Sequence, residues 1–416
     1  MSNLILNEGY EKNTDLFYGA QDDKIFTKKK KYIDLSMCAG SVLLGHNHKI
    51  FRQSVLKFLS KKVSNVAAPN VYAKIFATNI KKIVPNSEKI IFCNSGTEAV
   101  LKSLRLARAL NGKSKIALVT GGWHGSVDQL LYKTGENLKP IKLSSGLPSE
   151  TSKKLILIPY SDIKKSKSIL DKNKDKISCL IIEPIQGSLP YENIKKYLKF
   201  LEIYCKKNNI ILIFDEMITG LRTNCSSVQS YFKIKPDIST FGKCFGGGFP
   251  IGIISVSKII SIKLKKIKPK VFFGGTFSGN SIVAFVGNEV LNYIIKHKKK
   301  IFKKINTNAE YFEKNLNNFF KVENIDLKVY RFQSMLRLVY TKNPIKDRLG
   351  RDFLELKKNK LILRFRNYIK SKHIYIPASG IMFPSYSHKK KHIHFIIEEF
   401  KKGSLKVFKK DKNQKV

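Results

Sequence analysis

Ile210-Ile211-Leu212-Ile213-Phe214-Asp215-Glu216 places five successive apolar residues directly before two carboxylates. A continuous apolar run without polar alternation is typical of a strand buried on both faces, as the strands of parallel sheets are. In open α/β sheets ligands bind beyond the carboxyl ends of the strands, so Asp215 is predicted to face a ligand. From this stretch alone, Asp215 could equally cap the helix that follows.

Similar apolar runs occur on both sides of this stretch and alternate with amphipathic helical segments. They span residues 90–93, 116–120, 155–158, 179–182 and 251–256. Such alternation predicts an α/β fold in which helices cover both faces of a mostly parallel sheet.

The chain divides by pattern into three segments. Residues 1–54 carry short strand signals, residues 55–290 are predicted to form a large ligand-binding domain, and residues 291–416 begin with a lysine-rich helix pattern. The last segment is predicted to be a smaller α+β domain. Its basic end, residues 401–416, is expected to be a partly disordered tail.

The composition indicates a globular protein, because 416 residues with 43% apolar side chains can bury a substantial core. The sequence contains neither a secretory signal nor an apolar run long enough to span a membrane, so we expect a soluble, cytoplasmic protein. The six cysteines form no CxxC pair, which favours reduced thiols over a metal site or disulfides.

The chain is strongly basic, with 78 Lys and Arg against 31 Asp and Glu and a net charge of +47. This balance raises a polyanion-binding protein as one hypothesis. The basic residues are spread along the whole chain, however, with runs at 28–31, 298–300 and 389–391. A solvated basic surface is therefore favoured over a nucleic-acid site.

A candidate phosphate site follows the run at 90–93. There Asn94-Ser95-Gly96-Thr97-Glu98 precedes an amphipathic helical pattern, and Ser95 and Glu98 have the spacing of a capping box. Free amides at such a helix start, aided by the helix dipole, form a site suited to a phosphate. The alternative is an ordinary helix cap without a ligand.

Lys243 stands apart from the other lysines, most of which lie in solvated runs. It occurs within Phe241-Gly242-Lys243-Cys244-Phe245-Gly246, a pattern that predicts a strand-to-loop turn presenting the amine toward a ligand. A lysine beside a cationic or apolar neighbour can lose its proton near neutral pH, as Schiff-base chemistry requires.

Two glycine-rich segments could complete such a site. Gly121-Gly122-Trp123-His124-Gly125 contains the only tryptophan of the chain, which could stack on a planar ligand. In Gly274-Gly275-Thr276-Phe277 a threonine among glycines could donate to a phosphate. Taken singly, the two segments could instead supply a core aromatic and a turn.

Taken together and in order, six motifs resemble the class III aminotransferases, especially glutamate-1-semialdehyde aminomutase and its relatives, over about residues 30–290. They are Asn94-Ser-Gly-Thr-Glu-Ala99, Gly122-Trp-His-Gly125, Ile182-Glu-Pro-Ile-Gln-Gly187, Phe214-Asp-Glu-Met-Ile-Thr-Gly220, Pro236-Asp237 with Gly242-Lys243, and Gly275-Thr-Phe-Ser-Gly-Asn280. The resemblance implies a pyridoxal-phosphate (PLP) enzyme of fold type I, with a mostly parallel seven-stranded sheet in its large domain. It also implies a smaller domain built from both chain ends, and a homodimer with active sites at the interface.

The resemblance further implies roles for the matching residues. Lys243 corresponds to the lysine that holds PLP as a Schiff base and carries protons, and Asp215 to the carboxylate at the pyridine nitrogen. Trp123 corresponds to an aromatic that stacks on the cofactor, with His124 beside it. Glu183 lies in a matching motif and is expected near the substrate.

The phosphate site implied by the resemblance consists of Ser95, Gly96 and Thr97. Thr276 would reach the phosphate bound by the partner subunit. No metal is expected.

The substrates are predicted to be a small-molecule amino donor and a carbonyl acceptor. Ile218 stands where relatives have Gln or Met, and residues 378–383 replace a Phe-Glu pair of the aminomutases. The N-terminal segment also lacks the arginine with which the aminomutases bind a carboxylate. These departures argue against glutamate-1-semialdehyde as the substrate.

The stretches 334–337 and 348–355 resemble aminomutase-like proteins of surface-polysaccharide pathways, which favours amino-sugar biosynthesis. The alternatives are a glutamate-1-semialdehyde 2,1-aminomutase that makes 5-aminolevulinate, or an amino-acid racemase or epimerase. An alternative of another class is a polyanion-binding protein on an inactive fold.

Overall fold

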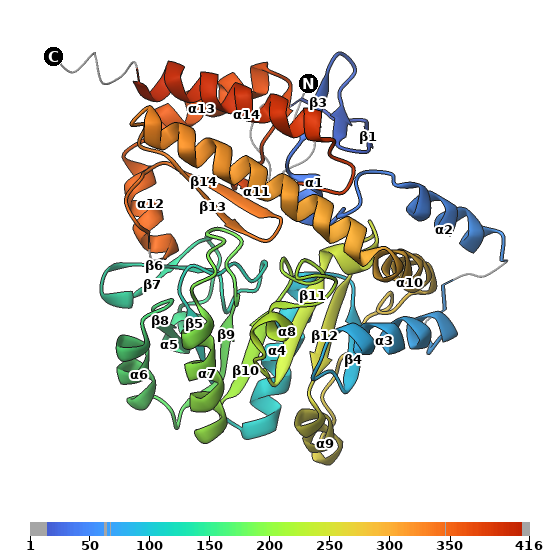
Figure 1. Cartoon of the computed structure of the whole chain (residues 1–416). Helices are drawn as coiled ribbons and strands as arrows, with labels where there is room; N and C mark the ends of the chain where they lie inside the picture. The colour runs from blue at the N-terminus through green and yellow to red at the C-terminus, as the bar shows by residue number, and fades with distance from the viewer. Residues whose placement is uncertain (1–14, 62–64, 67, 346, 410–416) are drawn as a thin grey trace.

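A seven-stranded sheet forms the centre of the computed structural model, which describes residues 15–61, 65–66, 68–345 and 347–409. Its spatial order is β4-β12-β11-β10-β9-β5-β8. The strands are β4 (Lys89–Cys93), β5 (Lys115–Val119), β8 (Leu155–Ile158), β9 (Ile177–Ile182), β10 (Ile211–Asp215), β11 (Ile238–Gly242) and β12 (Gly252–Val256). The predicted seven-stranded α/β sheet is thus confirmed, and Figure 1 shows it in the lower half of the molecule.

The sheet is parallel apart from β12, which pairs antiparallel with both β11 and β4. The pairs β10–β11, β10–β9, β9–β5 and β5–β8 are parallel. The carboxyl ends of all strands other than β12 therefore meet at one edge of the sheet, where α/β folds bind ligands.

β10 shows why the apolar run at 210–214 folds into this sheet. All five residues of the strand are buried. Leu212 and Phe214 belong to one hydrophobic cluster, whereas Ile211 and Ile213 belong to another. Successive side chains of a strand point to opposite faces, so both faces of the sheet are covered.

Helices supply the covering layers. In the first half of the chain they are α2 (Lys49–Leu59), α3 (Val71–Ile83), α4 (Gly96–Asn111), α5 (Ser149–Lys153), α6 (Ile163–Asp171) and α7 (Lys195–Lys207). They are followed by α8 (Val228–Phe232), α9 (Lys258–Lys266) and α10 (Ser281–Lys296). α7 packs in the cluster of Leu212, and α4 packs in the cluster of Ile213. A hairpin of β6 (Tyr132–Thr134) and β7 (Pro140–Lys142) lies beside them, joined by the turn η1 (Glu136–Leu138).

A second layer of elements lies above the sheet in Figure 1 and contains both ends of the described chain. The strands β1 (Gly19–Gln21), β2 (Lys24–Phe26) and β3 (Lys31–Asp34) form a sheet with β15 (Ile374–Tyr375). A second sheet contains β13 (Lys328–Phe332), β14 (Met335–Val339) and β16 (Ile381–Met382). The helices here are α11 (Lys298–Val322), α12 (Arg348–Leu356), α13 (Asn359–Ser371) and α14 (Lys390–Ser404).

The predicted tail is wrong for residues 401–409. α14 continues to Ser404, and the π-helical turn η3 (Leu405–Lys409) follows it. Val407 is buried in the hydrophobic cluster of the second layer, and Phe408 packs against Phe365. Apolar residues placed between the lysines therefore fold this segment onto the core, while residues 410–416 lie outside the described chain.

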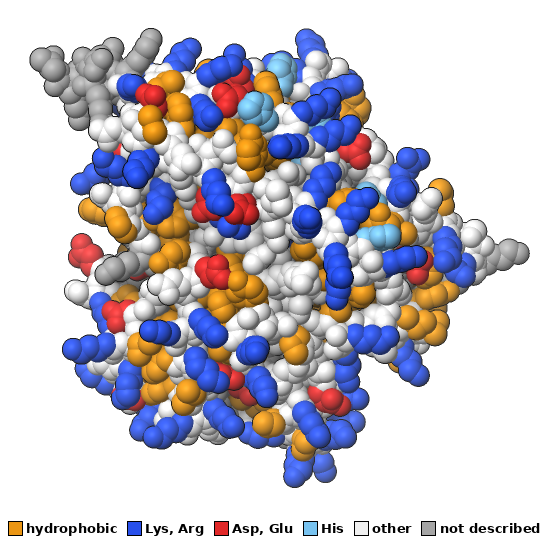
Figure 2. Space-filling view, in the orientation of Figure 1, with side chains coloured by type: hydrophobic (Ala, Val, Ile, Leu, Met, Phe, Trp, Pro, Cys, Tyr) orange, Lys and Arg blue, Asp and Glu red, His pale blue; other side chains and the backbone are white. Residues whose placement is uncertain are grey.

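Lysine and arginine side chains are spread over the whole visible face, with acidic side chains between them (Figure 2). None of the helices in the described part of the chain combines the length and apolar character that crossing a bilayer requires.

Candidate functional site

A cavity of about 320 Å³ opens at the carboxyl edge of the sheet. The segments that line it come from the ends of β4, β5, β10 and β11, from the loop before β12, and from Ser41 in the N-terminal part of the chain. The lining residues are Ser41, Asn94, Ser95, Gly96, Thr97, Val100, Trp123, His124, Gly125, Asp215, Met217, Ile218, Lys243, Phe249, Pro250 and Ile251. Most of the residues that the sequence predicted for the site therefore meet here.

The first wall is the start of α4. The Ser95 hydroxyl accepts a hydrogen bond from the Glu98 amide at 3.1 Å, so Ser95 is the predicted N-cap. The Glu98 carboxylate accepts from the Asn94 amide at 2.7 Å, one residue earlier than in a standard capping box. Neither the Gly96 nor the Thr97 amide is used by this cap, and both residues line the cavity. The arrangement offers two amides and the positive end of a 16-residue helix to an anion.

Gly252 allows this wall to form. A Cβ atom added to Gly252 would lie 2.0 Å from the Ser95 carbonyl oxygen and 2.7 Å from its carbon. β12 therefore approaches the backbone before α4 more closely than any side chain would permit.

Asp215 ends β10 at the floor of the cavity and is 3% exposed. One carboxylate oxygen lies 2.8 Å from Nδ1 of His124. The other accepts from the Thr240 hydroxyl at 2.9 Å and from the Met217 amide at 3.1 Å. Thr240 stands directly opposite Asp215 in the β10–β11 register, which explains a contact that the sequence patterns did not reveal.

His124 is buried, and its Nε2 atom has no hydrogen-bond partner among the described residues. Its Nδ1 atom is occupied by Asp215. A buried imidazole that is held on one side and free on the other retains a polar atom for a ligand.

Glu183 follows β9 and is 5% exposed. Its carboxylate accepts a hydrogen bond from the Trp123 amide at 3.0 Å. Burial raises the pKa of Glu183 to about 7, an effect that nearby His124 opposes and nearby Asp215 reinforces. Glu183 does not line the cavity, and it lies behind the Trp123 loop instead.

Lys243 follows the last residue of β11 and adopts a left-handed backbone conformation with φ of +45°. Its amine lines the cavity and has no hydrogen-bond or ion-pair partner in the described part of the chain. Burial lowers the pKa of Lys243, and the positive charge of Arg222 lowers it further, against the opposing effects of Cys244, Asp215 and Glu183. A larger fraction of neutral amine is therefore present near neutral pH than for an exposed lysine.

Arg222 is a residue of this site that the sequence analysis missed. It is 1% exposed and has no carboxylate partner among the described residues. Its guanidinium donates to the carbonyls of Gly40 and Ile218 and lies 4.5 Å from the centre of the Phe383 ring. The available signal was that Arg222 is the only charged residue between Glu216 and Lys233 in a very basic chain.

Two predicted residues occupy outer positions. Trp123 is 51% exposed at the rim of the cavity. Thr276 is exposed in a turn and does not line the cavity of its own chain. The Lys102 amine donates to the Phe273 carbonyl at 2.6 Å, which holds the loop before Thr276 against α4.

These residues fit pyridoxal phosphate. The amides at the start of α4 suit its phosphate, the buried Asp215 suits a protonated ring nitrogen, and the unpaired amine of Lys243 suits its aldehyde. In the described residues no three His, Cys, Asp or Glu side chains converge to hold a metal ion. Fold and site together define a PLP-dependent enzyme of fold type I.

Comparison with known proteins specifies the family. The model of the family "Aminotransferase class-III" matches residues 18–402, and the chain belongs to this family. The chain is 33% identical to glutamate-1-semialdehyde 2,1-aminomutase of Methanocaldococcus jannaschii, over 84% of its own length and 80% of that protein. It is 32% identical to the enzyme of the same name from Thermodesulfovibrio yellowstonii, over 94% and 90% of the two chains.

Solved structures share the fold. An omega-transaminase from Sphaerobacter thermophilus aligns with a TM-score of 0.88 at 22% identity, covering 95% of this chain and 92% of that one. A glutamate-1-semialdehyde aminomutase from Pseudomonas aeruginosa aligns with a TM-score of 0.85 at 14% identity, covering 94% and 88%. The predictions of a class III, PLP-dependent aminotransferase or aminomutase are confirmed.

Proposed function

We propose that this enzyme transfers an amino group between a small-molecule donor and a carbonyl acceptor, and that Lys243 is its catalytic residue. The observation that carries the proposal is the partly buried, unpaired amine of Lys243 in one cavity with Asp215 and the free amides of α4. Among the residues that the structure describes, no other lysine lines this cavity.

When bound, pyridoxal phosphate supplies an electron-accepting ring that stabilises negative charge on the carbon next to the substrate nitrogen. Lys243 would hold the cofactor through its amine, and the same amine would take a proton from that carbon of the substrate and return one elsewhere. Its lowered pKa suits both tasks, because a neutral amine is required for attack and for accepting the proton.

Asp215 keeps the ring nitrogen protonated in this proposal. Its orientation is fixed by Thr240, Met217 and His124, so the carboxylate does not need to reorganise when the cofactor binds. Gly96 and Thr97 donate their amides to the phosphate, with the Ser95 side chain completing the cap. Trp123, at the exposed rim of the cavity, would cover the ring.

For the substrate, two observations compete. The relatives at about a third identity are named glutamate-1-semialdehyde 2,1-aminomutase, which favours that reaction. The apolar Ile218, and residues 378–383 in place of a Phe-Glu pair, favour another substrate, and we propose an aminomutase-like transfer to a keto sugar or similar carbonyl compound. A racemase or epimerase needs only Lys243 and the same cavity.

A homodimer is part of the proposal. Thr276 is exposed on a turn anchored near the start of α4, and in the proposed dimer it would contact the phosphate site of the second copy. We further propose a cytoplasmic enzyme whose basic surface is solvated, since the lysines and arginines on the face shown in Figure 2 are spread out without gathering into one patch.

The visible absorption spectrum of the purified protein tests the proposal. We expect a band from covalently bound PLP that a suitable amino donor bleaches, and we expect Lys243→Ala to lack that band after dialysis. Lys258→Ala, an exposed lysine at the start of α9, is the matched control and should keep the band. A parent protein that shows no band after addition of PLP would contradict the proposed function and favour a binding protein.

A further inference from the structure

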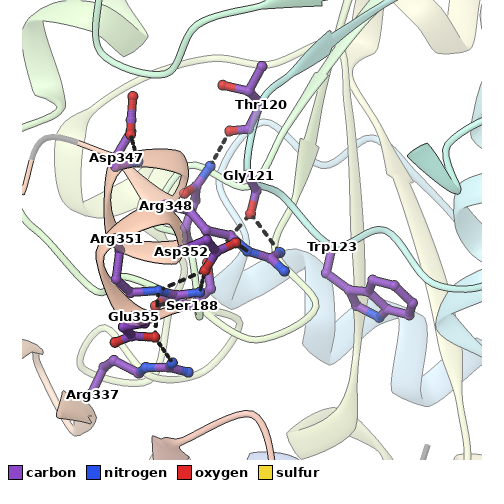
Figure 3. A network of polar contacts seen from close by, with 12 residues as sticks. Thr120, Gly121, Trp123, Ser188, Arg337, Asp347, Arg348, Arg351, Asp352 and Glu355 are labelled. Carbon is purple, nitrogen blue, oxygen red and sulfur yellow. Dashed lines mark hydrogen bonds and ion pairs between the residues drawn. The ribbon is translucent and has the colours of Figure 1, made fainter. Parts of the chain in front are cut away.

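Three arginines gather beside the mouth of the cavity, and we refer to Arg337, Arg348 and Arg351 as the arginine cluster. Arg348 and Arg351 lie on α12, and Arg337 lies on β14. In Figure 3, dashed contacts connect the three guanidinium groups through the carboxylates of Asp352 and Glu355. Arg348 extends past Gly121 on the side of Trp123. None of the three belongs to the phosphate site or to the surroundings of Lys243.

Two carboxylates link the cluster. Asp352 contacts Nε of Arg348 at 3.2 Å and the guanidinium of Arg351. Glu355 contacts Arg337 at 3.2 Å and Arg351 at 3.4 Å. The linked groups thus carry more positive than negative charge.

The neighbouring Asp347 forms no ion pair with the arginine cluster in the described chain, so no direct contact from its carboxylate neutralises the excess positive charge. Its carboxylate accepts the Gly350 amide at 2.8 Å and caps α12, and in Figure 3 it lies at the same end of the helix as Arg348, away from Arg351 and Arg337.

Arg348 does not itself line the cavity, but it extends toward Trp123 at the cavity rim (Figure 3). Its Nη1 atom donates to the Gly121 carbonyl at 3.2 Å, two residues before Trp123, which lines the cavity. The side chain of Arg348 is 33% exposed, and its Nη2 atom has no partner among the described residues. The Arg348 guanidinium is therefore held in place through Nη1, while its Nη2 atom remains available to a ligand.

The other two arginines position Arg348. Arg351 is 5% exposed and donates to the Ser188 carbonyl and to Asp352, which fixes α12 against the loop after β9. Arg337 is 8% exposed, and neither its Nε atom nor one oxygen of Glu355 has a partner in the described chain. Burial and repulsion by the positive charge of Arg351 lower the pKa of Arg337 to about 10. A bound anion would relieve this repulsion.

The loop around Gly380 accommodates the cluster. A Cβ atom added to Gly380 would lie 3.0 Å from the guanidinium carbon of Arg337. Ile381, the next residue, pairs with Arg337 in the sheet and lies beside Ile218 of the cavity wall across Gly187. Because Gly380 has no side chain, the guanidinium of Arg337 can lie behind the cavity wall that Ile218 forms.

We infer that Arg348, held by Arg351 and Arg337, forms a subsite for an anionic group of the substrate, a carboxylate or a phosphate distant from the reacting carbon. The inference rests on the proposed function and names the substrate class of that site. It predicts that productive donors or acceptors carry a negative charge at the end that faces α12.

Trp123 supplies a readout that does not depend on activity, because it is the only tryptophan in the chain and lies near Arg348. The PLP-loaded protein is titrated separately with glutarate and with inorganic pyrophosphate, at a constant ionic strength of about 0.2 M to screen non-specific surface binding. We expect a saturable change in Trp123 fluorescence with at least one probe, and the probe that binds more tightly identifies a carboxylate or a phosphate as the preferred group.

Arg348→Gln should weaken this binding about tenfold or more, since a charge-assisted hydrogen bond is lost. Arg105→Gln is the matched control, because Arg105 is also exposed and donates to a backbone carbonyl, that of Phe272, at 2.8 Å. Its titration should equal that of the parent, and Arg348→Lys should give an intermediate affinity.

The inference is overturned if neither probe gives a saturable change, or if Arg348→Gln binds both probes as the parent does. A lower melting temperature of Arg348→Gln with unchanged binding of both probes would mean that Arg348 only joins α12 to Gly121. That result would also overturn the inference. The visible cofactor band of the parent separately tests the proposed function, so the two failures can be distinguished.

Discussion

Substitution of Gly252 by alanine should damage both the stability of the protein and its affinity for PLP. The added Cβ atom would lie 2.0 Å from the Ser95 carbonyl oxygen and 3.1 Å from the Cys93 side chain. Both neighbours lie on β4 or on the cap of α4, and Gly252 pairs directly with Cys93 in the sheet. Neither the backbone carbonyl nor the strand can rotate away, so β12 and the start of α4 must separate.

Such an overpacked contact costs typically about 1–3 kcal/mol, and the involvement of backbone atoms places Gly252→Ala at about 3 kcal/mol. The Gly96 and Thr97 amides follow Ser95 directly, so the same displacement moves the candidate phosphate site. A loss of about 1.4 kcal/mol there corresponds to a tenfold weaker affinity for PLP. Unfolding in urea followed by circular dichroism measures the first quantity, and equilibrium dialysis against PLP measures the second.

Gly350→Ala is the matched control. Its nearest contact would be the Asp347 carboxylate at an ordinary 3.4 Å, and the residue lies in α12, where alanine favours the helix by up to about 1 kcal/mol. The control should be as stable as the parent or slightly more stable, with unchanged affinity for PLP. Parental stability together with parental PLP affinity in Gly252→Ala would refute the reasoning about the close approach of β12.

Four further predictions concern the buried charges and the cofactor. Asp215→Asn keeps an oxygen that can accept from Thr240 and Met217 but loses the negative charge, so turnover should fall about 100-fold or more. Parental turnover in a spectrophotometric assay would contradict the proposed role of Asp215 at the ring nitrogen. Arg222→Met should raise the pKa of Lys243, so the apoprotein should react with PLP only at higher pH than the parent, and an unchanged pH profile of this reaction would exclude the effect. Burial raises the pKa of Glu183 to about 7 from 4.5, so its contribution to the free energy of unfolding is complete below about pH 4.5 and is lost as the pH rises through 7. The free energy of unfolding of Glu183→Gln should therefore rise by up to about 3 kcal/mol relative to that of the parent between pH 5 and pH 8. Urea unfolding of both proteins at both pH values checks this difference. Removal of PLP should lower the melting temperature, because a ligand at 100 times its dissociation constant stabilises the fold by about 2.7 kcal/mol, and the shift should be smaller in Lys243→Ala.

The strands of the large sheet were predictable because burial on both faces leaves a local pattern. The run at 210–214 became β10 within one residue at each end, and the runs near 90, 116, 155, 179 and 251 became strands of the same sheet. β11, the strand before Lys243, was implied only by the turn that follows it. Its sequence Ile238-Ser-Thr-Phe-Gly242 mixes polar and apolar residues, so it lacks a continuous apolar run although all five residues are buried. The helical end at 405–409 was mispredicted because its apolar residues are outnumbered by lysines in the local sequence.

Most of the candidate site was also predictable, since its residues occur in short motifs at strand ends. The roles of Lys243, Asp215 and the other predicted residues stay predictions until the experiments above are done. Arg222 and Thr240 were missed because their contacts join separate segments of the chain, and no local motif reveals such contacts. Thr240 meets Asp215 only through the register of neighbouring strands, and Arg222 reaches Gly40 across 182 residues of sequence.

The sequence by itself determined the α/β fold, the family resemblance and the residues of the cofactor site, because apolar periodicity and motif spacing depend on a few neighbouring residues. Only the tertiary structure decided which polar groups share one environment. The contact between Arg348 and Gly121 joins residues 227 positions apart, and the unpaired state of Lys243 depends on every element packed around it. Burial, charge and hydrogen bonding between distant segments arise from how the two layers pack, and no local pattern specifies that packing.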